Sequence, residues 1–159
     1  MAHLPEVREH SKYFGVRGDV IIPIASSTVG GTSFAGVGIT LPLIGIQGGY
    51  DFTDRTEAGF SVRGTFRTLI LISEISLESL YRIPDETGAG LYVGIGGDLV
   101  FTIVLTAQTT IFGAHAVVGY NFPVSNSTSA FIEAQPGLFA NSTGALYFLS
   151  LAGGFNFHF

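Results

Sequence analysis

The charged residues of this chain recur at even spacings along short segments, and this spacing limits the chemistry they can perform. Arg17 and Asp19 are two residues apart, and Glu74 and Glu78 are four apart. Side chains at even spacings lie on the same face of an extended strand. If that face is enclosed, charges of opposite sign must pair, because an isolated charge in a low-dielectric interior costs several kcal/mol. We therefore predict an ion-pair network with the members Arg17, Asp19, Glu57, Arg63, Arg67, Glu74, Glu78, Arg82, Asp98, His115 and Glu133.

Catalysis is the alternative chemistry for some of these residues. His115 and Glu133 could act as a general acid and base, and Ser61 or Ser150 could serve as a nucleophile beside them. A catalytic group needs access to its substrate, whereas these four residues belong to the polar face that we expect to be enclosed. We therefore predict no catalytic site.

The sequence contains no pattern typical of a metal or cofactor site. His3, His10 and His158 lie near the ends of the chain and lack the spacing of metal ligands. The run Gly94-Ile95-Gly96-Gly97 resembles a phosphate-binding loop only superficially, because it falls within an expected strand and no helix follows it. A close approach of two strands or a bulge explains these glycines better. We predict neither a metal nor a cofactor.

The elements that position the charged residues are eight segments in which apolar and polar side chains alternate with a period of two. This alternation is typical of β-strands with one apolar face. With their flanking residues, the segments reach the roughly 9–11 residues that a tilted strand needs to cross a bilayer. An even number of strands places both termini on one side. The alternation covers residues 14–24, 44–52, 58–70, 75–82, 91–103, 112–122, 130–138 and 145–159.

Turns and irregularities separate or interrupt these segments. Val37, Ile39 and Leu41 have the opposite parity to the segment that follows them, which predicts a bulge or kink near Pro42. Pro136 is expected to interrupt the pairing of the seventh segment. Turns are predicted at residues 53–55, 84–88, 105–109, 123–128 and 141–144, and after Ile72.

The composition suits a chain whose outer surface meets lipid. Only 12% of its 159 residues are charged and 47% are hydrophobic, and the mean hydropathy is +0.47. Yet the sequence lacks an uninterrupted run of about 18 apolar residues, the length at which a helix can cross the hydrocarbon. Without such a helix, only a closed barrel satisfies every backbone polar group in hydrocarbon. The net charge of −5 and the absence of a basic cluster argue against nucleic acid as a partner.

Alternation alone leaves open whether the apolar face points outward to lipid or inward to a soluble core, as in a lipocalin-like barrel. Three features favour the outward direction. Glycines are frequent on the polar face, which suits a crowded interior, and Lys12 is the only lysine, whereas a soluble barrel would expose several. The third feature is an aromatic girdle, because apolar-face aromatics gather near one end of the strands. These are Phe14, Tyr50, Phe52, Phe60, Tyr81, Tyr120, Phe122, Phe155 and Phe157.

The last segment, Gly153-Gly154-Phe155-Asn156-Phe157-His158-Phe159, resembles the terminal strand of bacterial outer-membrane proteins, in which aromatic residues alternate up to a final Phe. The whole chain is similar in plan to the small eight-stranded barrels of the OmpA and OmpX type. The resemblance implies a transmembrane eight-stranded antiparallel up-and-down β-barrel in the bacterial outer membrane, surrounded by the lipid bilayer and inserted by the barrel-assembly machinery. We expect it to be a monomer. The membrane girdle and C-terminal assembly signal would comprise Tyr50, Phe52, Tyr120, Phe122, Phe155, Phe157 and Phe159.

The expected organisation is an N-terminal periplasmic segment over residues 1–12 and a transmembrane barrel over residues 13–159. Residues 1–11 lack the apolar core of a signal peptide, so we expect this numbering to begin at or near the mature end. Many OmpA-type proteins continue into a peptidoglycan-binding domain, whereas this chain ends at Phe159. OmpX-like barrels often project long polar strands, whereas the connections after Ile72 and Val104 look short and apolar.

The leading functional hypothesis is a structural, non-enzymatic outer-membrane barrel that contributes to envelope integrity or anchoring. An eight-stranded barrel is only wide enough to be filled by its own side chains, here by the ion-pair network. The second hypothesis is a narrow or gated conduit or binder for small or hydrophobic molecules, and a lipid-modifying enzyme is a minor alternative. Apolar residues that could line a pocket on the lumen side are Leu69, Leu71, Val100, Val104 and Phe148.

Overall fold

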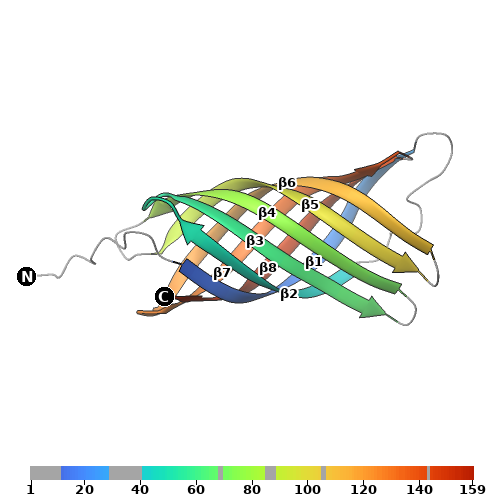
Figure 1. Cartoon of the computed structure of the whole chain (residues 1–159). Coiled ribbons are helices and arrows are strands. Elements are labelled where there is room, and N and C mark those ends of the chain that lie inside the picture. The colour runs from blue at the N-terminus through green and yellow to red at the C-terminus, as the bar shows by residue number, and fades with distance from the viewer. Residues whose placement is uncertain (1–11, 29–40, 68–69, 85–88, 105–106, 143) are drawn as a thin grey trace, which may run out of the picture.

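The computed structural model describes residues 12–28, 41–67, 70–84, 89–104, 107–142 and 144–159, and every regular element in these ranges is a β-strand (Figure 1). None of the described residues forms a helix long and apolar enough to span a membrane. The strands are β1 (Lys12–Thr28), β2 (Leu41–Asp51), β3 (Thr56–Arg67), β4 (Ile70–Pro84), β5 (Gly90–Val104), β6 (Ala107–Ser125), β7 (Thr128–Asn141) and β8 (Gly144–His158).

The strands form one closed antiparallel barrel, as the sequence predicts. Each strand pairs with the next, and β8 pairs with β1 to close the sheet. At this seam the N–H of Lys12 donates to the carbonyl of Phe159 at 3.2 Å, and the N–H of Phe159 donates to the carbonyl of Lys12 at 3.0 Å. We call the end that holds Lys12 and Phe159 the terminal end, and the opposite end, where Thr28 pairs with Gly144, the loop end (Figure 1).

The strands are staggered around the barrel. Following paired residues once around from Tyr13 leads back to Pro23, ten positions farther along β1. Barrels with such a stagger have strands tilted by roughly 35–45°, and the tilt is plain in Figure 1. At this strand number the interior is just wide enough for side chains to fill it.

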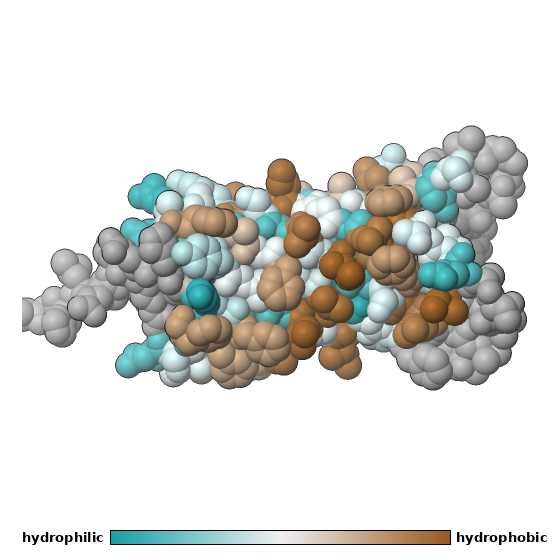
Figure 2. Space-filling view, viewed as in Figure 1, coloured by the Kyte–Doolittle hydropathy of each residue, from teal (hydrophilic) through white to brown (hydrophobic). Residues whose placement is uncertain are grey.

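The outer surface of the barrel is apolar. Large hydrophobic side chains point outward along every strand, with Ile44 79% exposed and Ile95 70% exposed. Figure 2 shows hydrophobic residues over the middle of the barrel and more hydrophilic ones toward its rims. Among the described strand residues with charged side chains, only Lys12, at the terminal rim, points outward. The apolar-outward orientation predicted from the alternation is therefore the one observed.

Several strands extend farther than the alternation suggests. Residue Ile70, predicted to end the third segment, begins β4, so the chain turns before Ile70 and not after Ile72. Likewise β6 begins at Ala107 and continues to Ser125, although the sequence predicts turns around both ends. Turn-forming residues such as Pro123, which pairs with Ser129, still join the ladder where the neighbouring strand is long enough.

The predicted irregularities hold in part. The pairing of β1 with β2 runs without a register shift from Leu41 to Tyr50, so the bulge expected near Pro42 is absent there. A shift does occur in the pairing of β1 with β8, between Pro23 and Ala25. In the pairing of β6 with β7, the register skips the positions around Pro136, as expected for a residue without an N–H. Val37 and Ile39 lie outside the described residues.

Candidate functional site

The lumen at mid-barrel is filled by buried charged side chains. Arg17, Asp19, Arg63 and Glu74 are each at most 3% exposed. They point inward because they occupy the polar parity of their strands, and the stagger of the barrel brings strands that are distant in sequence to the same level. The site is therefore built from the barrel wall itself and requires no loop.

Arg17 holds one side of the cluster. Its Nε and Nη2 donate to the two carboxylate oxygens of Asp19 at 3.0 and 2.7 Å, a bidentate pair. Nη2 also donates to Glu133 Oε2 at 3.0 Å, and Nη1 donates to Gln47 Oε1 at 3.1 Å. The guanidinium group lies over the ring of Phe131, 5.9 Å from its centroid. Arg17 thus joins β1 to β2 and β7.

Arg63 holds the other side and shares a partner with Arg17. Its Nη1 donates to Asp19 Oδ1 at 2.7 Å, the same oxygen that accepts from Arg17 Nη2. The remaining bonds run to Glu74 Oε1 at 2.6 Å and to Gln135 Oε1 at 3.1 Å. Asp19 therefore bridges two guanidinium groups, which offsets their mutual repulsion.

His115 links two further carboxylates. Its Nδ1 lies 2.8 Å from Asp98 Oδ2, and its Nε2 lies 3.2 Å from Glu78 Oε1. An imidazole ring donates from both nitrogens only in its cationic form, so this geometry suits a histidine that serves as a third cation of the cluster. Gln135 Nε2 donates to the same Glu78 oxygen at 3.2 Å and to Glu133 Oε2 at 2.9 Å, which connects the His115 group to the Arg17 group.

All eight strands contribute to this connected cluster, which we call the lumen network. Two further hydrogen bonds, donated by neutral side chains, complete it. Tyr92 donates from its hydroxyl to Glu133 Oε1 at 2.8 Å, and Gln47 Nε2 donates to Asn156 Oδ1 at 2.6 Å. The members are Arg17, Asp19, Gln47, Arg63, Glu74, Glu78, Tyr92, Asp98, His115, Glu133, Gln135 and Asn156.

A second, smaller ion-pair cluster lies nearer the terminal end. Arg82 bonds to Asp51 at 3.1 Å and also pairs with Glu57. Between this cluster and the lumen network is a cavity with about 20 Å³ of water-accessible space, lined in part by Glu78, Asn121 and residues of both clusters. That volume is enough for about one water molecule.

Among the described residues, an apolar cluster lies in the lumen toward the loop end. We call the buried cluster of Ile21, Leu43, Val100, Phe139, Leu146 and Phe148 the apolar plug. The rings of Phe139 and Phe148 are stacked, with centroids 4.2 Å apart and an interplanar angle of 14°. Of the residues expected to line an apolar pocket, Val100 and Phe148 instead pack into this plug. Leu71 was assigned to the wrong face, because the earlier turn into β4 gives it outward parity and leaves it 40% exposed. Leu69 and the side chain of Val104 lie outside what the structure describes.

Glycines opposite the inward rings make room for them. A Cβ on Gly119 would lie 2.3 Å from Tyr92 Cζ, and one on Gly96 would lie 2.4 Å from the ring of His115. Each of these glycines pairs directly with the residue whose ring covers it. The same arrangement places Phe139 over Gly113. The glycines of the polar face therefore let rings lie flat on the inner wall, so that their polar atoms reach the network.

The structure brings together most of the residues predicted to form the network. Arg82 and Glu57 belong to the smaller cluster, because the stagger places them nearer the terminal end, and the side chain of Arg67 is outside the described set. Sequence reasoning missed the neutral members Gln47, Tyr92, Gln135 and Asn156, and the acidic Asp51. Their inward parity was the available signal, since a polar side chain enclosed in a barrel needs a hydrogen-bond partner.

The residues considered for catalysis are engaged or enclosed. His115 and Glu133 do not face each other, because each is bound to other members of the network. Ser61 and Ser150 are each 1% exposed. In the described ranges, no group of three or more His, Asp or Glu side chains is arranged to hold a metal ion.

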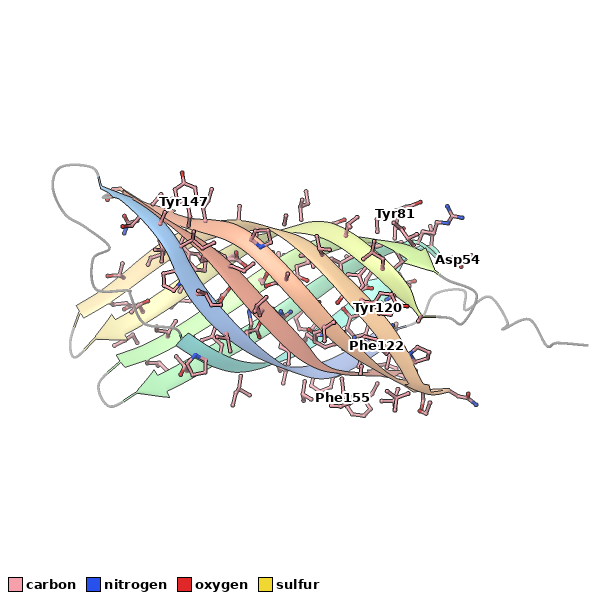
Figure 3. All side chains as sticks on the ribbon, turned by 180° about the vertical axis from the view of Figure 1, so that it is seen from behind. Asp54, Tyr81, Tyr120, Phe122, Tyr147 and Phe155 are labelled. Atoms are coloured by element: carbon pink, nitrogen blue, oxygen red, sulfur yellow. The ribbon has the colours of Figure 1, made fainter. Side chains whose placement is uncertain are left out.

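The aromatic residues predicted for the girdle lie toward the terminal end. Tyr50 contacts Phe52 and Tyr120 contacts Phe122, with ring centroids 5.2 and 4.8 Å apart. Figure 3 shows Tyr120, Phe122 and Phe155 near one end of the barrel and Tyr147 near the other. Phe155, Phe157 and Phe159 all point outward and are 49%, 48% and 77% exposed.

The fold is a closed eight-stranded antiparallel barrel, and solved structures of outer-membrane proteins share it. The crystal structure of Neisserial surface protein A (NspA) matches with a TM-score of 0.70 at 13% identity, over 93% of this chain and 97% of that chain. The N-terminal β-barrel domain of Pseudomonas aeruginosa OprF matches with a TM-score of 0.62 at 16% identity, over 96% and 100%. The outer membrane protein OprG from Pseudomonas aeruginosa matches with a TM-score of 0.62 at 11% identity, over 94% and 95%. No protein-family model and no curated protein sequence matches the chain.

Proposed function

We propose that this chain is a bacterial outer-membrane barrel with a structural role, a closed body in the bilayer that contributes to envelope integrity or to anchoring. The observation that carries the proposal is the lumen network, to which all eight strands contribute. A cross-section filled by hydrogen-bonded polar side chains from every strand, six of which contribute charged residues, would fix the strands relative to one another and close the lumen to water. In this proposal the barrel is a monomer, is inserted by the barrel-assembly machinery and has no catalytic activity.

Residence in the membrane is supported by the outer surface. An outward Arg or Lys side chain would cost about 2–4 kcal/mol at the bilayer midplane, and of the charged strand side chains that the structure describes, only Lys12 at the rim points outward. The direct test is extraction and electrophoresis. The protein should partition with outer membranes, require detergent for solubility and migrate differently before and after boiling. A protein that is soluble without detergent and shows no heat-dependent shift would contradict the proposal.

A closed lumen is tested by conductance across planar bilayers. The purified barrel should give no steady current, because in this proposal the hydrogen-bonded side chains of the network and the packed side chains of the apolar plug fill the lumen. The N-terminal domain of a conducting porin, reconstituted in parallel, would show that the bilayers report insertion. Steady single-channel currents from this chain would overturn the structural role.

A narrow or gated conduit is the second candidate function, and the cavity on the terminal side favours it. Arg17, Glu78 and Glu133 line both this cavity and the network, so their pairs lie where a path would continue. A gate of this kind would require the pairs to exchange partners. Brief, voltage-dependent openings in the same bilayers would favour the conduit, whereas silence over long recordings would favour the structural role.

A further inference from the structure

We propose that the apolar plug is a second barrier in the lumen, sufficient by itself to exclude water and ions when the lumen network is relaxed. The inference rests on the proposed closed barrel and deepens it by assigning the seal to specific residues. The sequence suggests that the network alone closes the lumen. The structure has two groups of lumen residues along the barrel axis, one charged and one apolar.

The residues of the plug are closely packed. Phe139 and Phe148 stack at 4.2 Å, and both rings are nearly enclosed, at 8% and 3% exposure. Leu43 is 1% exposed and belongs to the same cluster. The members come from β1, β2, β5, β7 and β8, with Ile72 of β4 and Ile111 of β6 packed against them. Together with these two neighbours, the plug therefore includes residues of every strand but β3, and it does not line one wall.

The plug lies on the loop-end side of the lumen network. Ile21 and Val100 each lie two residues closer to the loop end than network members of their own strands, Asp19 and Asp98. Phe148 pairs with Gly137, which lies two residues closer to the loop end of β7 than the network member Gln135. The plug thus adjoins the network on the side toward the loop end, where Leu43 pairs with Asp19 and Val100 pairs with Glu74. Any path through the barrel must cross both layers.

The plug and the lumen network differ in how they interact with an ion. An ion that enters the lumen network meets carboxylate, amide and guanidinium groups that can replace part of its hydration shell. The six side chains of the plug offer an ion no such group, and apolar constrictions close channels by expelling water. An unpaired charge in apolar surroundings costs far more than thermal energy. The plug should therefore block ions even when the ion pairs of the lumen network change partners.

Conductance of matched chains tests this inference. The network variant, Arg17→Gln with Glu133→Gln, removes one charge of each sign and leaves Asp19 paired with Arg63. The plug variant is Phe148→Ser, with Phe148→Leu as the control that keeps the site apolar. We expect no current from wild type or from the network variant, and a steady current when the network variant is combined with Phe148→Ser. A network variant that conducts as well as the combined chain would overturn the proposal.

The same recordings separate this inference from the proposed function. A conducting wild-type barrel would contradict the closed structural role itself. A silent wild type with a conducting network variant would leave the closed role intact and contradict only the plug. If Phe148→Ser does not fold, Leu43→Asn supplies a polar replacement of similar size at another fully buried plug position.

Labelling of single cysteines gives a second readout that requires no current, because the chain contains no cysteine of its own. Asn121→Cys lines the cavity and Val100→Cys lies in the plug. Asn121 is half-buried and pairs with Gly90, the first residue of β5, so it lies close to the terminal rim. A small water-soluble methanethiosulfonate reagent should therefore modify the cysteine at 121 in the folded barrel and leave the one at 100, a buried position, unmodified. Equal reactivity of the two positions would show that water enters the plug and would overturn the proposal. Both variants should react equally after unfolding, which confirms that the reagent is active.

Discussion

The hydroxyl of Tyr92 donates a hydrogen bond of 2.8 Å to Oε1 of Glu133, while Arg17 and Gln135 both donate to Oε2 of the same carboxylate. Each oxygen of Glu133 is therefore satisfied by a different part of the lumen network. The Tyr92 ring reaches this position by lying across Gly119 on the neighbouring strand. The neutral side chain of Tyr92 and the absence of a side chain at Gly119 thus help to fix the position of the buried Glu133 carboxylate.

Removal of the Tyr92 hydroxyl should weaken the barrel without opening it. In Tyr92→Phe, Glu133 Oε1 loses its donor, and a buried polar group left without a partner costs about 1–3 kcal/mol. The free energy of unfolding in urea, measured in lipid vesicles, should fall by this amount. Tyr147→Phe, at an exposed tyrosine near the other end, is the control and should be nearly neutral. Equal stability of the two variants would show that the hydroxyl contributes nothing.

A methyl group at Gly119 should displace the same ring. The Cβ of Gly119→Ala would lie 2.3 Å from Tyr92 Cζ, so the ring must move. Overpacking of this kind costs typically about 1–3 kcal/mol. Gly18→Ala is the matched control, since its Cβ points outward and would come no closer than 4.0 Å to Leu43 O. Unfolding titrations of both should show a loss only for Gly119→Ala, and a loss of the same size in both would contradict the crowding argument.

The fold could be predicted almost entirely because side-chain parity has a period of two. This period assigns Arg17 or His115 to the inner face whatever the other strands do. It does not locate turns, because polar and apolar residues near a hairpin fit either strand. The face of Leu71 was wrong for this reason, since the chain turns before Ile70 and the parity count restarts there.

The partners within the site could be predicted only in kind. Arg17 and Glu133 belong to β1 and β7, which are not neighbours, and they meet because the stagger of the whole barrel puts them at one level. That stagger is a sum over all eight pairings and leaves no local mark in the sequence. It also separates Arg82, which pairs near the terminal end, from the lumen network of which the sequence made it a member.

Loss of Arg63 should be far more costly than loss of an exposed arginine. Arg63→Gln would leave Glu74 and one side of Asp19 without their guanidinium partner, and removing one member of a buried pair costs about 3–5 kcal/mol. Arg55→Gln is the control, because Arg55 lies in an exposed turn, where its guanidinium donates to the hydroxyl of Tyr81 at 3.3 Å. Surface interactions of that kind contribute about 0–1 kcal/mol.

The measurement is again unfolding in lipid vesicles, followed by the shift in mobility between folded and unfolded protein. If Arg63→Gln folds to a lower yield, Glu74→Gln tests the same pair from its acidic partner, at a smaller change in volume. Two buried variants as stable as Arg55→Gln would mean that the carboxylates find other partners and that the network is not the element that holds the strands.

A charge placed on the outer face should report the bilayer directly. Ile44 is 79% exposed and pairs with Gly18, which lies between the network residues Arg17 and Asp19, so it stands outside the barrel at the level of the network. Ile44→Arg should destabilise the folded barrel in lipid by about 2–4 kcal/mol, the cost of an arginine near the bilayer midplane. Val124→Arg, at a 60% exposed position near the terminal end of β6, should cost much less, because the cost falls to about 0–1 kcal/mol near the interface. Unfolding in lipid vesicles measures both, and equal stabilities would mean that the outer surface at Ile44 does not face hydrocarbon.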